Sequence, residues 1–157
     1  MRVGVRFTLT SALLGVAAVW LSILVATLVR PSTELEGLVE SAGLPLCQTL
    51  LVVTLAKLLW EGAIFRHLLL RRMTPLRRSA MLMTGELSSF TLARFATGLL
   101  GGALMPAFLI SHAGGGELPQ FVITSGMLFA ACLAAELLER YLFFAACATP
   151  RMPGGPR

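Results

Sequence analysis

Apolar residues gather in four long blocks along this chain, and short polar segments separate the blocks. Within the blocks, polar residues do not recur at the helical interval that gives a surface helix a wet face. Each block has about 20 residues or more, the length that a helix needs to cross roughly 30 Å of hydrocarbon. The pattern predicts four membrane-spanning helices, at about 7–29, 44–65, 86–110 and 121–148.

Between the blocks, prolines, glycines and charged residues indicate where the helices end. Residues 32–43 are rich in glutamate and are predicted to form a polar connection, either a solvated acidic loop or one or two amphipathic turns along the interface. Pro45 suits the first turn of the second helix. Pro106 and the following glycine run are expected to end the third helix. We therefore expect residues 1–157 to form a single all-α membrane domain, a four-helix bundle with a short tail at 149–157.

The composition agrees with a polytopic membrane protein rather than a soluble domain. Hydrophobic residues make up 56% of the chain and charged residues 13%, and the mean hydropathy is +0.81. A net charge of +5 does not indicate a nucleic-acid partner, because the basic residues lie beside apolar blocks and no soluble domain carries them. The expected partner of the apolar helix surfaces is the lipid bilayer.

The arginines predict the orientation of the chain in the membrane. Four helices place both termini and the loop after the second helix on one side. By the positive-inside rule that side is cytoplasmic, so we expect a bacterial cytoplasmic (inner) membrane protein with both termini inside. The loop arginines have two readings, as lipid-facing topology determinants or as a contact for a partner protein. They are Arg66, Arg71, Arg72, Arg77 and Arg78.

Several kinds of chemistry find no candidate residues in the sequence. His67 and His112 fall at opposite membrane ends, so they do not predict a membrane haem. The three cysteines lie far apart in apolar segments and lack metal or redox spacing. No phosphate loop, nucleophile elbow or zinc-protease motif is present. We expect neither a metal site nor an independent catalytic centre.

Ionisable residues inside the apolar blocks are the main candidates for function, because charges at membrane depth are costly to bury. We expect Lys57 to pair with Glu61, and Glu136 with Arg140, since each pair is four residues apart on one helix face. The remaining charges, Arg94 and Glu139, should meet between the third and fourth helices. This gives a neutral buried layer of three acids and three bases. Its members are Lys57, Glu61, Arg94, Glu136, Glu139 and Arg140.

Small residues suggest how the helix that carries Arg94 packs. Gly98 and Gly102 follow Arg94 at four-residue steps and provide a face on which another helix can approach closely. Arg94 should therefore face protein rather than lipid. The buried charges have two readings, as pairs that only lock the bundle or as a site for a quinone head group and its protons.

One stretch of the fourth helix resembles a known family. The segment Glu136–Phe144 reads ELLERYLFF, and Pro150-Arg-Met-Pro-Gly154 follows it. Together with Lys57-x-x-Trp60-Glu61 and the arginine-rich loop, it is similar to the C-terminal half of the membrane anchor subunits of dimethyl sulfoxide reductase-type molybdoenzymes, which are related to polysulfide reductase membrane subunits. The likeness extends over nearly the whole chain.

The resemblance implies a haem-free anchor subunit that exchanges electrons and protons with menaquinol or ubiquinol and docks an iron–sulfur subunit and a molybdopterin catalytic subunit. It carries the quinol and proton roles onto the residues Lys57, Glu61, Arg94, Glu136, Glu139, Arg140 and Tyr141. Family bundles have eight or more helices, so this chain is expected to be half of one. It could be a truncated reading frame, a split subunit, or a half that pairs with itself or with a missing N-terminal half. Two other readings stay open, a transporter or channel half and a purely structural anchor.

Overall fold

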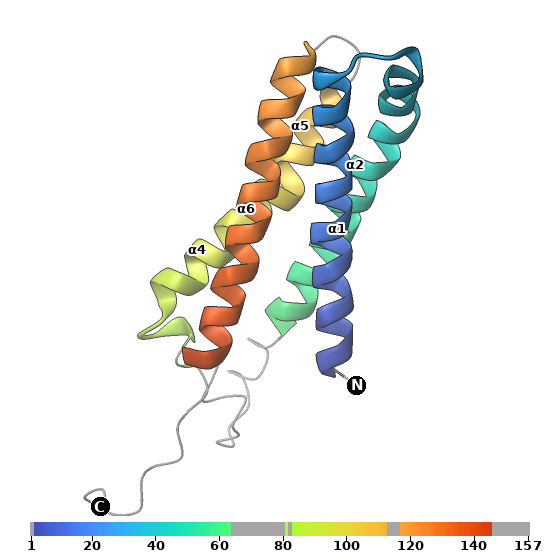
Figure 1. The fold of residues 1–157 in the computed structure, drawn as a ribbon. Helices are drawn as coiled ribbons and strands as arrows, with labels where there is room; N and C mark the ends of the chain where they lie inside the picture. The colour runs from blue at the N-terminus through green and yellow to red at the C-terminus, as the bar shows by residue number, and fades with distance from the viewer. Residues whose placement is uncertain (1, 64–80, 82, 113–116, 146–157) are drawn as a thin grey trace, which may run out of the picture.

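The computed structural model of the protein describes residues 2–63, 81, 83–112 and 117–145, and these ranges are helical apart from short connections (Figure 1). Within them, four helical segments are long and apolar enough to cross a membrane. The protein is therefore an all-helical, multi-pass membrane protein. The helices are α1 (Arg2–Val29), α2 (Thr33–Gly62), α4 (Ser88–Leu99), the π-helix η2 (Leu100–Leu104), α5 (Met105–Ser111) and α6 (Leu118–Ala145).

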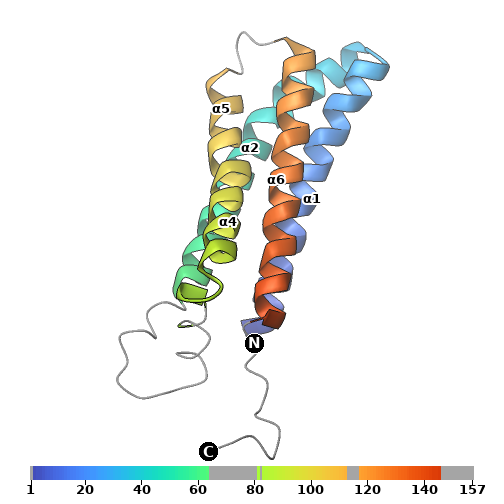
Figure 2. The ribbon, with the colours of Figure 1, turned by 90° about the vertical axis from the view of Figure 1, so that its left-hand side faces the viewer.

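The helices run antiparallel in chain order, and α4, η2 and α5 together make the third span (Figures 1 and 2). Helix α1 packs between α2 and α6, and the third span packs against the same two helices. Helices α2 and α6 thus face each other across the bundle. The start of α1, the end of α2, the start of α4 and the end of α6 lie at one end, drawn lowest in Figure 1 and called the lower end below.

The hydrophobic core follows a stripe along α1. Leu13, Ala17, Trp20 and Leu24 recur every three or four residues and are all buried, so they share one helix face. They form a cluster with buried residues of the other spans, among them Leu128 of α6. Large apolar side chains on the outer faces of all four spans are exposed, as expected for surfaces that face lipid.

Helix α2 corrects the predicted polar connection at 32–43. The helix begins at Thr33 and continues through Pro45. Ser32 caps it, since its hydroxyl accepts a hydrogen bond from the N–H of Leu35 at 3.3 Å, and acidic residues in the first turn favour the helix dipole. At 30 residues, α2 is about 45 Å long, so it must tilt or extend beyond the hydrocarbon.

The third span runs through Pro106 and ends at Ser111, next to the predicted end at residue 110. The turn directly before this proline is π-helical, and the N–H of Met105 donates to the carbonyl of Leu100, five residues earlier. In a regular α-helix the proline ring would crowd the carbonyl four residues before it. The wider turn keeps the span continuous.

The remaining helix boundaries differ from the prediction by a few residues. Helix α1 begins at Arg2 rather than near residue 7, and α6 begins at Leu118. The predicted ends of the second and fourth helices, 64–65 and 146–148, lie outside the described residues.

Two glycines of the π-helix allow the spans to approach closely. A Cβ added to Gly101 would lie 2.8 Å from the Cβ of Ala131 and 2.9 Å from the backbone nitrogen of Cys132 on α6. A Cβ added to Gly102 would overlap the side chain of Thr54 on α2. At these two glycines the third span therefore packs closely against both α2 and α6.

Replacing Gly101 with alanine is expected to lower the free energy of unfolding by about 1–3 kcal/mol, because the new methyl group meets the backbone of α6. Gly126→Ala is the matched control, since nothing lies within 4 Å of a Cβ at that position. The control should be neutral or slightly stabilising, because alanine favours helices. Denaturation of both variants in detergent micelles, followed by circular dichroism, checks this; equal midpoints would contradict the close packing.

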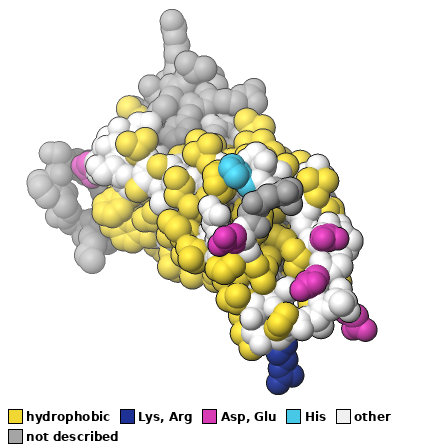
Figure 3. All heavy atoms as spheres, turned by 90° about the horizontal axis from the view of Figure 1, so that it is seen from above, with side chains coloured by type: hydrophobic (Ala, Val, Ile, Leu, Met, Phe, Trp, Pro, Cys, Tyr) yellow, Lys and Arg dark blue, Asp and Glu magenta, His cyan; other side chains and the backbone are white. Residues whose placement is uncertain are grey.

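Acidic side chains are exposed at one end of the bundle. Figure 3 looks onto the end opposite the lower end, where acidic side chains are spread over the surface. The exposed glutamates near this end are Glu34, Glu36, Glu40 and Glu117, and Arg30 is the exposed basic residue there.

Candidate functional site

Five ionisable side chains meet between α2, α4 and α6 in the lower half of the bundle. We call them the buried charge cluster, which comprises Lys57, Glu61, Arg94, Glu136 and Glu139. Glu139 lies six residues before the last described residue of α6, which corresponds to a depth of roughly 9 Å. The cluster therefore lies inside the bundle, a short way in from the lower end, where the first helix begins.

Lys57 is the centre of the cluster. It is the only lysine of the chain, and it is 3% exposed. Its Nζ atom contacts a carboxylate oxygen of Glu136, lies 2.9 Å from Glu139 and lies 3.8 Å from Glu61. The predicted pair of Lys57 and Glu61 is thus confirmed, and the lysine also reaches across the bundle to two carboxylates of α6.

Arg94 forms the second positive centre. Its Nη2 atom contacts Glu61 and lies 3.5 Å from Glu139, which confirms the predicted approach of Arg94 and Glu139. Arg94 is 4% exposed, so it faces protein, as predicted. The three carboxylates and two cations form one continuous set of contacts, because Glu61 and Glu139 each touch both cations.

A threonine of α1 completes the arrangement, although nothing in the sequence had singled it out. Thr10 Oγ1 accepts a hydrogen bond from Lys57 Nζ at 2.8 Å and donates one to the second carboxylate oxygen of Glu136 at 2.9 Å. Lys57, Thr10 and Glu136 therefore form a triangle of hydrogen bonds. All four spans therefore contribute to the site. The contribution of α1 is an uncharged threonine, which a search for ionisable residues does not find.

Replacing Thr10 with valine is expected to lower the free energy of unfolding by about 1–3 kcal/mol, because two buried charged groups each lose a hydrogen bond. Valine keeps the volume and removes the hydroxyl. Thr8→Val is the control, since the hydroxyl of Thr8 is exposed and donates only to the carbonyl of Gly4. Micelle unfolding midpoints check the difference, and Thr10→Ser should restore the native value. A Thr10→Val protein as stable as Thr8→Val would contradict the triangle.

Two predicted site residues lie outside the cluster. The predicted pair of Glu136 and Arg140 does not form: Glu136 turns inward to Lys57, whereas Arg140 is exposed and its guanidinium lies 4.3 Å from the ring of Phe7. Long basic side chains near helix ends extend away from the apolar interior. Tyr141 is 50% exposed, and its ring packs against Phe90 with the centroids 5.0 Å apart.

The predicted layer of three acids and three bases is therefore wrong in one member. Among the described residues, three glutamates contact two cations, and Arg140 belongs to the outer surface.

The predicted packing glycines lie on the inner face of the third span. A Cβ at Gly98 would lie 3.4 Å from Leu58 of α2 and 3.7 Å from Ala135 of α6, and Gly102 faces Thr54. Arg94 and these glycines thus share the face that meets both neighbouring helices. The predicted contact residues Arg66, Arg71, Arg72, Arg77 and Arg78 lie outside the described residues.

The cluster is suited to holding polar oxygen atoms and protons away from water. Carboxylates accept protons, and lysine and arginine donate hydrogen bonds to carbonyl or hydroxyl oxygens. Over the part of the chain that the structure describes, no group of three or more histidine, cysteine or acidic residues is arranged to hold a metal ion.

Comparisons with protein-family models, with curated proteins and with solved structures give no match. The case for a function therefore depends on the geometry of the cluster and on the sequence resemblance.

Proposed function

We propose that the chain is the membrane anchor subunit of a multi-subunit molybdopterin oxidoreductase and that the buried charge cluster serves the head group of menaquinol or ubiquinol. In this proposal the subunit also docks an iron–sulfur subunit, and a molybdopterin catalytic subunit completes the complex. The chain lies in a bacterial cytoplasmic membrane with both termini inside. The resemblance of Glu136–Phe144 and of the Met-Pro-Gly segment to such anchors supports this proposal.

The observation that carries the proposal is the contact of Lys57 with three carboxylates in a buried position. Oxidation of a quinol releases two protons and two electrons. The carboxylates can accept the protons, and the electrons pass to the iron–sulfur partner, since the chain itself contributes no redox-active group in this proposal. Each buried charge is costly unless it is paired, so a site of this kind needs the contacts that the cluster supplies.

Binding of decylubiquinol to the protein in lipid nanodiscs tests the proposal. Glu139→Gln is expected to weaken binding about tenfold, because the variant changes a charged contact of both Lys57 and Arg94. Glu117→Gln is the control, because this glutamate is exposed at the opposite end of the bundle. The proposal fails if wild-type protein shows no saturable binding, or if the two variants bind equally well while both remain folded.

A transporter or channel half is the second candidate, and the π-helix η2 favours it. Interrupted helices near the middle of the membrane often form the substrate or ion site of transporters. The π-helical turn at Leu100–Leu104 is a local departure from α-helical geometry within the third span, between Thr54 of α2 and Ala131 of α6. Ion flux through liposomes that contain only this protein would favour this candidate, and tight liposomes would count against it.

A further inference from the structure

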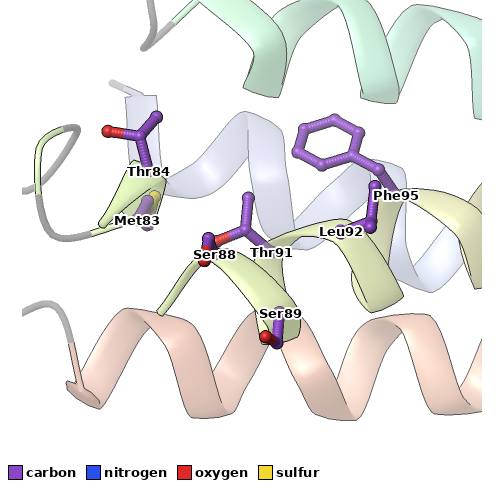
Figure 4. Close-up of a pocket in the computed structure, with 7 residues that line it drawn as sticks. All are labelled: Met83, Thr84, Ser88, Ser89, Thr91, Leu92 and Phe95. Atoms are coloured by element: carbon purple, nitrogen blue, oxygen red, sulfur yellow. The ribbon is translucent and has the colours of Figure 1, made fainter. Parts of the chain in front are cut away.

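A surface hollow lies at the start of α4, at the same end of the bundle as the buried charge cluster (Figure 4). Hydroxyl groups and apolar side chains both line it. The lining residues are Met83, Thr84, Ser88, Ser89, Thr91, Leu92 and Phe95. A mixed lining of this kind suits an amphipathic ligand better than a purely polar or purely apolar one.

Thr91 is the buried part of this lining. It is 8% exposed, and its Oγ1 atom has no hydrogen-bond partner in the described structure. Threonines in helices commonly donate to a carbonyl of the preceding turn, as Thr97 of the same helix does to Ala93 at 2.8 Å. A buried hydroxyl without a partner is costly, and it indicates a group that a ligand or water can satisfy.

Arg94 lies one helical turn further along the same face of α4. Its Nη2 atom is held by Glu61 and Glu139, whereas Nε and Nη1 are buried without a partner among the described residues. The guanidinium carbon lies 4.9 Å from the centre of the Phe95 ring, and Phe95 lines the hollow. Thr91 therefore lines the hollow itself, whereas Arg94 lies behind the lining, beside the ring of Phe95.

We infer that the hollow on α4 is the entrance to a docking site for a flat ring with oxygen substituents, in which Arg94 and Thr91 bind the oxygens. The ring packs against Phe95 and Leu92, and an apolar tail leaves toward the lipid. Arg94 provides hydrogen-bond donors that no acceptor among the described residues uses, so an acceptor oxygen is the expected partner. This inference rests on the proposed function, because a quinol head group is a ligand of this class.

Photolabelling of the wild-type protein in nanodiscs with an azido-substituted decyl benzoquinone tests the inference. The label is expected on the segment 83–95, and unlabelled decylubiquinone should compete with it. Labelling confined to α2 or α6 would overturn the inference and leave the proposed function standing. An absence of saturable labelling anywhere would overturn both.

A pair of threonine variants provides an independent measurement. Thr91→Val is expected to weaken binding of the azidoquinone about fivefold, through the loss of one hydrogen bond. Thr97→Val removes a hydroxyl that donates within α4 and does not line the hollow, and it should bind as the wild type does. Equal binding by two folded variants would overturn the role of Thr91. If Thr91→Val does not fold, the position of the label on the wild-type protein still decides the inference.

Discussion

Replacing Lys57 with methionine is expected to lower the free energy of unfolding by about 3–5 kcal/mol, because the change leaves buried carboxylates without their shared cation. Lys57 contacts Glu61, Glu136 and Glu139, and Thr10 donates to the same Glu136. Methionine fills a similar volume, so the loss comes from the charge rather than from a cavity. The variant should yield little folded protein.

Arg30→Met is the control for this experiment, since it also removes one positive charge but from an exposed position at the opposite end of the bundle. Its unfolding midpoint in micelles should match that of the wild type. Because Lys57 is the only lysine, its reaction with an amine reagent gives a second readout, which mass spectrometry separates from reaction at the N-terminus. The side chain should be protected in folded protein; rapid modification in folded wild-type protein would contradict its burial.

Removing Lys57 and Glu136 together is expected to restore the fold but not the function. The double variant Lys57→Met/Glu136→Met deletes an ion pair instead of breaking one, and apolar replacement of a buried pair is often nearly neutral for stability. Arg94 keeps its contacts with Glu61 and Glu139 in this variant. Stability should return to within about 1–2 kcal/mol of the wild type.

Quinol binding by this double variant separates a functional cluster from a structural one. If the cluster is functional, binding should stay at least about tenfold weaker than in the wild type, since the lysine donor and one carboxylate are gone. Normal binding of decylubiquinol by a well-folded double variant would support a purely structural role for these residues. The double variant Thr8→Val/Arg30→Met, which alters two exposed positions, is the control for the number of substitutions.

Much of the fold could be predicted because a membrane-spanning helix needs a long run of apolar residues, which is easily recognised in a sequence. Soluble domains seldom contain blocks of about 20 apolar residues, and all four blocks are helices in the structure. The prediction for residues 32–43 was wrong, because glutamates are typical of solvated connections as well as of helix starts. Ser32 followed by acidic residues is itself a helix-start signal, and it marks the observed beginning of α2 at Thr33.

Only some contacts of the site could be predicted, both within one helix and between helices. Lys57 and Glu61 are four residues apart and do pair, but the same rule failed for Glu136 and Arg140. Spacing places two residues on one face without telling whether that face looks into the bundle or outward. Glu136 looks inward to Lys57, which lies on the helix across the bundle.

Thr10 shows the limit of reasoning from charge alone. Its hydroxyl joins Lys57 to Glu136, yet in the sequence it resembles Thr8, whose hydroxyl only returns to its own helix. Which of the two faces the interior depends on how α1 packs between α2 and α6. That packing is a property of the folded bundle.

Infrared difference spectroscopy of the protein in nanodiscs, recorded between the oxidised and reduced forms of decylubiquinone, tests the central claim most directly. If the cluster receives quinol protons, the wild-type spectrum should show a change in carboxyl protonation. That change should be lost or shifted in Glu139→Gln and kept in Glu117→Gln, whose substituted residue lies at the opposite end of the bundle. An identical carboxyl signal in both folded variants, or no carboxyl signal in the wild type, would contradict the claim.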